Sequence, residues 1–162
     1  MKKIIKIKTD KLFKNITDDV AAAAKEWGKS GIVNVFSKHT TFSIWCTEDE
    51  ILHKTDVRFF LDRMVPKFKD PEGEHKNIKY LHDLISLRDD VPEGERINGH
   101  SHIRSMFFNS SETVPVEKGK LILGEWKKIF GVELDPTRNR EVVCSFIAVS
   151  YTHLTLPTKR IV

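Results

Sequence analysis

The sequence is short of cysteine and of long apolar runs, and each shortage excludes a class of protein. Two cysteines among 162 residues cannot build the disulfide framework of a small secreted protein, and there is no C-x-x-C redox motif. Both, Cys46 and Cys144, lie in apolar strand-like runs, which indicates buried free thiols. No window reaches the roughly 18 apolar residues of a membrane span. Charges interrupt the stretch where a signal peptide would be apolar, so we expect a cytoplasmic protein with no membrane partner.

The chain also lacks the Walker loop, the dinucleotide glycine fingerprint and the G-x-S-x-G motif of familiar enzyme sites. Its net charge is +4, from 27 Lys and Arg against 23 Asp and Glu, and the two signs are interspersed. The basic start, residues 2–8, alternates Lys with Ile, which predicts an edge strand rather than an arm for nucleic acid. We therefore expect no nucleic-acid partner. The mild positive excess suits a phosphorylated small molecule, although solubility explains it equally well.

What the chain does contain is enough apolar material for one core. Forty per cent of its residues are hydrophobic, including ten Phe and three Trp. A length of 162 residues fits one ordinary domain, which we place at residues 1–150. Residues 151–162 continue no periodicity of the preceding strand, and we expect them to be an artefactual or disordered tail.

Apolar periodicity and breaker residues predict an α+β fold: a single compact domain with a mixed or antiparallel sheet and two to four helices. Helices are expected over residues 17–27, 48–64, 80–87 and 102–108. Strands are expected over residues 2–8, 31–36, 41–47, 112–116, 120–124, 128–135 and 141–149. The polar break at residues 37–40, between two of these strands, predicts a hairpin or a bulge.

Three histidines form the main candidate site. His39 follows a strand, and His100 and His102 form an H-x-H pair after Gly99. Two such histidines point to one side only if the backbone is extended there. Together with His39 they would then supply the three ligands of a catalytic metal with an open fourth position. From spacing alone, hydrogen-bonded histidines without a metal are slightly favoured, and His82, beside Asp83, is a second-rank candidate.

Acidic and basic residues offer weaker signals. Glu48 and Asp56 are eight residues apart, just over two helical turns, so they would share a face that holds Mg²⁺ or supports a histidine. Solvated charges are the commoner case. Arg138 and Arg140 follow a proline turn, where they would form a forked phosphate clamp or a solvated hairpin tip.

Several segments resemble, in order, the motifs of the YjbQ family, whose members are often labelled secondary thiamine-phosphate synthases. The resemblance runs from about residue 5 to about residue 149. It rests on FKNITDDV (13–20), HTT (39–41), TEDE (47–50) with Asp56, YLHD (80–83), NGHSH (98–102), GKLILGEW (119–126) and ELDPTR (133–138).

The resemblance implies an α+β domain that forms a homotrimer. It implies a divalent metal, zinc or alternatively magnesium, held by His39, His100 and His102. Glu48, Asp56 and Arg138 fall on further motif positions and would take catalytic roles. The implied reaction joins a hydroxymethylpyrimidine diphosphate to a thiazole phosphate and releases pyrophosphate. Metal-dependent phosphoester hydrolysis at the same histidines and a non-enzymatic trimer that binds metal or a small molecule are the alternatives.

The sequence departs from the family pattern at four positions. Thr47 stands where the pattern has Asn, Phe42 replaces a small residue, and Glu125 and Lys127 replace Thr and Gln. If Glu125 and Lys127 face the pocket, the substrate differs from that of the family. Phe42 would either narrow the site or fill the core.

Overall fold

The computed structural model describes residues 1–67, 80–84 and 87–149, and it confirms the predicted α+β class. The predicted tail after residue 150 lies outside the described residues. The helices of the described part are α1 (Thr17–Trp27), α2 (Ile51–Met64), the 3-10 turn η1 (Leu81–Asp83) and α3 (Gly99–Ser105). The strands are β1 (Lys2–Lys8), β2 (Phe13–Asn15), β3 (Gly31–Ser37), β4 (Phe42–Glu48), β5 (Ser111–Glu117), β6 (Lys120–Leu121), β7 (Lys127–Glu133) and β8 (Asn139–Ala148).

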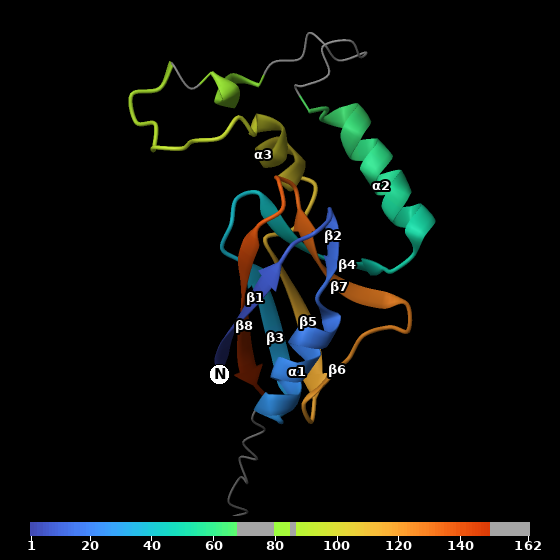
Figure 1. The fold of residues 1–162 in the computed structure, drawn as a ribbon. Helices are drawn as coiled ribbons and strands as arrows, with labels where there is room; N and C mark the ends of the chain where they lie inside the picture. Colours follow the sequence, from blue (N-terminus) through green and yellow to red (C-terminus); the bar gives the residue numbers. More distant parts are fainter. Residues whose placement is uncertain (68–79, 85–86, 150–162) are drawn as a thin grey trace, which may run out of the picture.

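The strands form two antiparallel sheets rather than the single sheet expected from the sequence (Figure 1). The first has the order β1-β8-β3-β5-β6, with β1 at an edge as its Lys/Ile alternation predicts. The second has the order β2-β7-β4. The hairpin or bulge predicted at residues 37–40 is wrong, because β3 and β4 belong to different sheets. The loop that carries His39 instead crosses from one sheet to the other.

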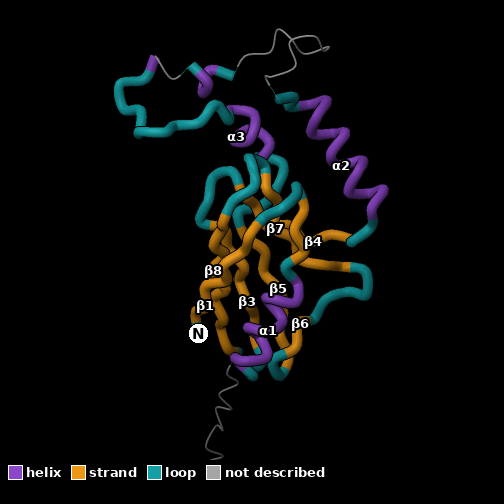
Figure 2. The backbone as a smooth tube through the Cα atoms, in the orientation of Figure 1, coloured by secondary structure: helices purple, strands orange, loops and turns teal. Residues whose placement is uncertain are grey.

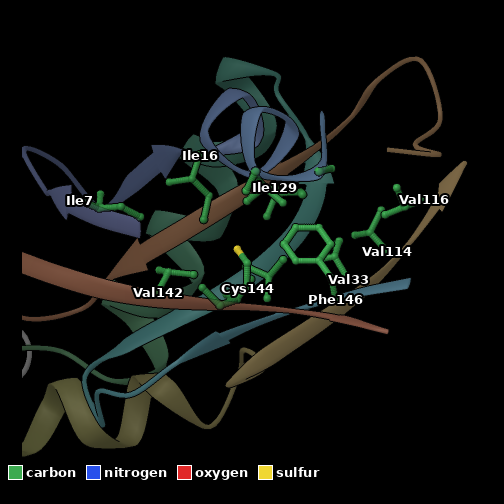
Figure 3. Packing of buried hydrophobic residues seen from close by; sticks show 14 of the residues in the cluster. Ile7, Ile16, Val33, Val114, Val116, Ile129, Val142, Cys144 and Phe146 are labelled. Carbon is green, nitrogen blue, oxygen red and sulfur yellow. The ribbon is translucent and has the colours of Figure 1, made fainter. Parts of the chain in front are cut away.

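The main core lies between the two sheets and is closed by α1 (Figure 3). Alternating residues of β3, β5 and β8 face inward, as a pleated strand with one buried face requires. The core members that Figure 3 labels are Ile7, Ile16, Val33, Val114, Val116, Ile129, Val142, Cys144 and Phe146. Burial of each large aliphatic side chain contributes about 1.5–3 kcal/mol, so this cluster dominates the stability of the fold.

A second, smaller core lies on the other face of the three-stranded sheet. Phe130 and Val132 alternate with Ile129 along β7 and point away from the main core, and Leu61 of α2 packs against them. Among the fourteen residues of α2, all of them in the described part of the chain, Leu61 alone is buried. Figure 2 shows α2 standing beside the sheets with most of its length free of them.

Helix α3 begins three residues earlier than predicted, at Gly99, and packs beside η1. A Cβ at Gly99 would lie 2.6 Å from the Cβ of Tyr80 and 2.9 Å from Oδ1 of Asp83, so only glycine permits this approach. The backbone N–H of Gly99 donates to Oδ1 of Asp83 at 2.7 Å. The helix predicted over residues 80–87 is the short turn Leu81–Asp83, and residues 85–86 lie outside the described residues.

The two cysteines and the helix lengths bear on the expectations drawn from composition. Both cysteines are free thiols, with Cys144 buried and Cys46 half-buried. Burial raises the pKa of each thiol to about 11, so neither is a reactive thiolate. None of the helices in the described residues has the length and apolar character needed to cross a membrane.

Candidate functional site

Helix α3 turns the two histidines of the H-x-H pair to different sides. Both lie inside the helix Gly99–Ser105, where residues two apart are separated by about 200°. His100 is buried, and His102 is half-buried. The extended backbone that would have brought both imidazoles to one point is therefore not present.

His39 and His102 instead line one pocket of about 570 Å³ between the β3–β4 loop and α3. Two segments more than 60 positions apart in the sequence thus bring one imidazole each to the same cavity. Figure 1 shows that the β3–β4 loop and α3 lie at the same end of the sheets. The other side chains around this histidine pocket are mixed polar and apolar: Phe36, Ser37, Lys38, Thr40, Phe42, Ser43, Ser105, Phe108 and Ser110.

His39 is held in one tautomer by the backbone of β8. Its Nε2 accepts the N–H of Glu141 at 3.0 Å, so in neutral His39 the proton sits on Nδ1. Burial lowers the pKa of His39, and the nearby charges of Arg140 and Lys38 lower it further. His39 is therefore a neutral imidazole at pH 7, with Nδ1–H as its remaining donor.

His102 stacks against His82, with ring centroids 4.5 Å apart and an interplanar angle of 31°. Burial lowers the pKa of His102, and the neighbouring His82 adds to the effect. His82, the second-rank candidate from the sequence, therefore lies against one ring of the pocket. Within the described residues, Nδ1 of His82, Oδ2 of Asp83 and Oδ1 of Asn98 are buried without a hydrogen-bond partner.

His100 lies on the opposite side of α3 and contributes to a different environment. Its side chain is 8% exposed and lies near Tyr80, with ring centroids 6.5 Å apart. Burial lowers its pKa to about 4, helped by the positive charges of Arg104 and Lys67. His100 is consequently a buried, neutral histidine. Among the described residues, the side chain that forms a hydrogen bond with its ring is that of Ser101, which does not line the histidine pocket.

The other predicted catalytic residues lie away from the histidine pocket. Glu48 ends β4 opposite Lys127, and Asp56 is exposed on α2, so the two do not share a helix face. The guanidinium of Arg138 pairs with Asp135, whose side chain is 2% exposed. None of the three lines the pocket that contains His39 and His102.

Arg140 has a structural role that its sequence position did not reveal. It forms a buried ion pair with Glu133, in which the two side chains are 3% and 1% exposed. Its Nη2 also donates to Oγ1 of Thr41 at 3.1 Å, and Thr9 donates to Glu133 at 2.8 Å. Arg140 is therefore neither a free clamp nor a solvated hairpin tip. It fixes the end of the loop that carries His39.

The predicted metal centre does not fit the residues of a single protomer. Zinc needs three or four ligand atoms about 2 Å from one point. Across residues 1–67, 80–84 and 87–149, no group of three His, Cys, Asp or Glu side chains is placed to hold a metal ion. Nε2 of His39 is already an acceptor, and His100 lies on the far side of α3. We derive no chemical step through a metal, and the centre stays a prediction.

The family departures are divided between the pocket and the surface. Phe42 fills the core and also lines the histidine pocket, so both roles considered for it apply. A Cβ at Gly131 would lie 2.3 Å from the Phe42 ring, which explains the glycine at this position of β7. Glu125 and Lys127 are exposed and do not line the pocket. The side chain of Thr47 forms a 2.9 Å hydrogen bond with His53.

Sequence reasoning missed Lys38, Ser105 and Ser110 as pocket residues. Lys38 stands next to His39 and pairs with Glu141, the residue whose N–H holds the His39 ring. Adjacency to His39 was the one available signal for Lys38. The two serines had none, because they reach the pocket only through the packing of α3 and of the segment that leads into β5.

Comparison with known proteins gives a consistent assignment. A model of the family described as UPF0047 protein YjbQ-like matches residues 3–149. A UPF0047 protein of Methanothermobacter thermautotrophicus is 33% identical over 129 residues, covering 79% of this chain and 77% of its own length. The UPF0047 protein YugU of Bacillus subtilis is 32% identical over 145 residues, covering 86% of this chain and 94% of its own.

Solved structures agree with the fold. A crystal structure of an uncharacterised YjbQ/UPF0047 protein of Clostridium acetobutylicum superposes with a TM-score of 0.67 at 29% identity, covering 89% of this chain and 98% of that one. A hypothetical protein of Aeropyrum pernix reaches a TM-score of 0.71 at 23% identity, which supports the fold alone. Neither protein carries a described activity.

Proposed function

The chain belongs to the YjbQ-like UPF0047 family, and on this premise we propose that it is a transferase that joins a hydroxymethylpyrimidine diphosphate to a thiazole phosphate. Pyrophosphate is the second product. The reaction takes place in the cytoplasm in this proposal, which agrees with two free thiols and no disulfide in the described chain. The substrates in this proposal are those that the resemblance to the family, carried in part by the histidine motifs, implies.

One observation carries the proposal: His39 and His102 meet in a pocket of about 570 Å³. The volume lies in the range typical of small-molecule sites. Both imidazoles have a lowered pKa because of burial, so both are neutral at pH 7. A neutral imidazole offers one N–H donor. Because it is uncharged, it does not repel the positive charge of the neighbouring Lys38.

The proposed reaction asks for charge stabilisation rather than proton transfer. A C–N bond forms between the thiazole ring nitrogen and the exocyclic methylene carbon of the pyrimidine. The C–O bond to the diphosphate breaks, and pyrophosphate leaves with the bonding electrons. Donors aimed at the departing oxygens lower the barrier of such a step. Nδ1–H of His39 and the ammonium of Lys38 are donors that line this pocket, whereas the hydroxyl of Ser105 already donates to the carbonyl of His102 at 2.7 Å.

The divalent cation remains part of the proposal for the assembled protein. Zinc, or alternatively magnesium, would neutralise charge on the diphosphate when bound. Elemental analysis of the purified protein beside a His39→Ala/His100→Ala/His102→Ala variant tests it. Near-stoichiometric metal that the variant loses supports the centre. Metal absent from both, after reconstitution, contradicts it and leaves the histidines as substrate-binding groups.

The proposal also includes a homotrimer. Helices α2 and α3 and the turn after α3 expose large apolar side chains, which is unusual for an isolated surface. They are Ile51, Leu52, Phe59, Phe60, Met64, Ile103, Met106 and Phe107. Light scattering of the purified protein should give three chain masses. A monomer at micromolar concentration would contradict this part of the proposal.

The direct test incubates the protein with both precursors and measures thiamine phosphate and pyrophosphate by mass spectrometry. Equal amounts of the two products, absent when either precursor is omitted, are the expected result. Phosphate or pyrophosphate released from a single precursor would instead establish hydrolysis. No product from any combination would reject the transferase.

A further inference from the structure

A second pocket of about 360 Å³ lies on the other side of α3 from the histidine pocket, and we propose that it binds a phosphate or diphosphate group. The two pockets share no lining residue. Arg104 of α3 lines the second pocket, whereas His102 and Ser105 line the first, so α3 is the wall between them. We call this second cavity the basic pocket. Its walls comprise Lys11, Leu12, Arg58, Asp62, Lys67, Arg104, Glu133, Leu134, Asp135, Pro136 and Thr137.

The acidic residues of the basic pocket are already neutralised by arginines. Asp62 pairs with Arg104 at 2.8 Å. Glu133 forms the buried ion pair with Arg140. Asp135 is covered as well: Arg138 pairs with it, and Asn98 donates to it at 3.1 Å. Carboxylates held in this way do not offset further positive charge in the cavity.

Three cations of the basic pocket remain uncommitted. Lys11, Arg58 and Lys67 take part in none of the ion pairs or side-chain hydrogen bonds found among the described residues. They come from three separate segments: the loop before β2, the middle of α2 and the residues after α2. Like charges gathered around one cavity repel each other, and a polyanion between them removes that cost.

A phosphate group matches this arrangement better than a carboxylate does. Its several oxygens and its charge near −2 can engage cations from three directions at once, whereas a carboxylate is a flat monoanion. The planar guanidinium of Arg58 suits two parallel hydrogen bonds to phosphate oxygens, and the lysines act as point charges. A cavity of about 360 Å³ accepts a diphosphate as well as a single phosphate.

The basic pocket also changes the assignment of the anion-binding role. The sequence pattern suggested that role for Arg138 together with Arg140, but the guanidinium of Arg138 is bound to Asp135 and Arg138 does not line the basic pocket. The charge and geometry on which the basic pocket rests are independent of the proposed transferase. A phosphate site here stands even if the chain joins no thiamine precursors.

Isothermal titration calorimetry with inorganic phosphate and with pyrophosphate tests the basic pocket. The Arg58→Gln variant should raise the Kd at least about tenfold, and Lys11→Gln/Arg58→Gln/Lys67→Gln about a hundredfold or more, since each removes a charge-assisted bond. Lys25→Gln, an exposed lysine in the last turn of α1, is the control with the same charge change and should leave the Kd unaltered. Comparison of the two anions shows whether one phosphate or two occupy the cavity.

Three outcomes would overturn the assignment. Equal weakening in Arg58→Gln and Lys25→Gln would mean that net charge alone attracts the anion. Loss of binding in His39→Asn/His102→Asn with binding retained in Arg58→Gln would place the anion in the histidine pocket. No measurable heat with either anion for the wild-type protein, supported by an unchanged melting temperature, would mean that no such site exists. Failure of the precursor assay, by contrast, leaves the basic pocket untouched.

Discussion

The molecule has two regions that differ in how much they bury. One comprises the two sheets and α1, and the other comprises the helices α2 and α3. The sheets enclose a core of fifteen buried residues, and a fully buried ion pair ties their strand ends together. Helix α2 buries only Leu61 among its described residues and exposes five large apolar side chains. Stability is therefore concentrated in the sheets. The pockets lie where the helices meet them, on the less tightly packed side.

This difference shows how a site can be shared between two regions. The tightly packed sheets position one histidine, and the less buried helix supplies the other. His39 belongs to the sheets through Glu141 and the Thr41–Arg140 contact. His102 belongs to α3, which is attached through Gly99, Asp83 and Arg104. Local stability of this kind is commonly uneven, with binding segments drawn from the less stable end. Changes in the sheets should then unfold the whole chain, while changes at the helices should act locally.

The largest effect is expected from Arg140→Met, which leaves Glu133 charged and unpaired in the interior. Loss of one partner of a buried pair costs about 3–5 kcal/mol of unfolding free energy. Urea unfolding measures it. The double variant Glu133→Leu/Arg140→Met should recover much of the loss, because no buried charge remains. A loss below about 1 kcal/mol for Arg140→Met alone would show that the pair is not a main element of the sheets.

Leu61→Ala tests the attachment of α2. Leu61 is 0% exposed, and its truncation opens a cavity in the second core, which costs about 2–4 kcal/mol. Arg63→Ala on the same helix is the control, since Arg63 is exposed, lies outside the apolar set of α2 and makes no ion pair among the described residues, so it should change stability by less than about 0.5 kcal/mol. Hydrogen exchange should show the loss first in α2. Equal effects of the two variants would mean that α2 is not held through Leu61.

His100 predicts how stability responds to pH. Its folded pKa is about 4, below the ordinary 6.5, because burial disfavours the charged form. The unfolded chain therefore binds the proton first, and stability is full above about pH 6.5 and falls as the pH drops toward 4. The loss is on the order of 2–3 kcal/mol. Urea unfolding of metal-free protein across this range measures it. His100→Asn should flatten the slope, and an equally steep slope in that variant would contradict the assignment.

Gly99→Ala is expected to lower the stability least of these variants. Its effect should be confined to the contact between η1 and α3. Its Cβ would approach Tyr80 and Asp83 too closely, at about 1–3 kcal/mol. η1 would shift away from α3, and the stacking of His82 on His102 would be lost. Gly124→Ala is the control, because the nearest heavy atom to its Cβ is 4.0 Å away. NMR shifts of the two histidine rings report the stacking, and unchanged shifts in Gly99→Ala would argue against this contact.

Local patterns in the sequence predicted the strands of the first sheet and helices α1 and α2 well. Alternation at Lys2–Lys8 and the β-branched run at Gly31–Ser37 are signals that depend on neighbouring residues only. The division into two sheets was not predictable, because pairing partners such as β3 and β8 are far apart in the chain. Strand β2, of three residues, was too short to show any periodicity.

The same contrast holds for the site. The motif histidines were found from spacing and resemblance, but their grouping depended on whether residues 99–102 were helical. Gly99 and the loop before it are compatible with either an extended backbone or the start of a helix, and the structure makes Gly99 the first residue of a helix, in close contact with Tyr80 and Asp83. That contact joins segments about twenty residues apart. The basic pocket depends on four distant segments, and no pattern in any one of them signals it.

The central claim is that His39 from the sheets and His102 from α3 act together on one substrate. Initial rates of thiamine phosphate formation in His39→Asn, His102→Asn and the double variant test it most directly, with His53→Gln as a histidine control outside the pocket. The account predicts that each single variant loses about a hundredfold or more, that the double variant loses little further, and that the control keeps its rate. Wild-type rates in both single variants, with the fold intact, would contradict it.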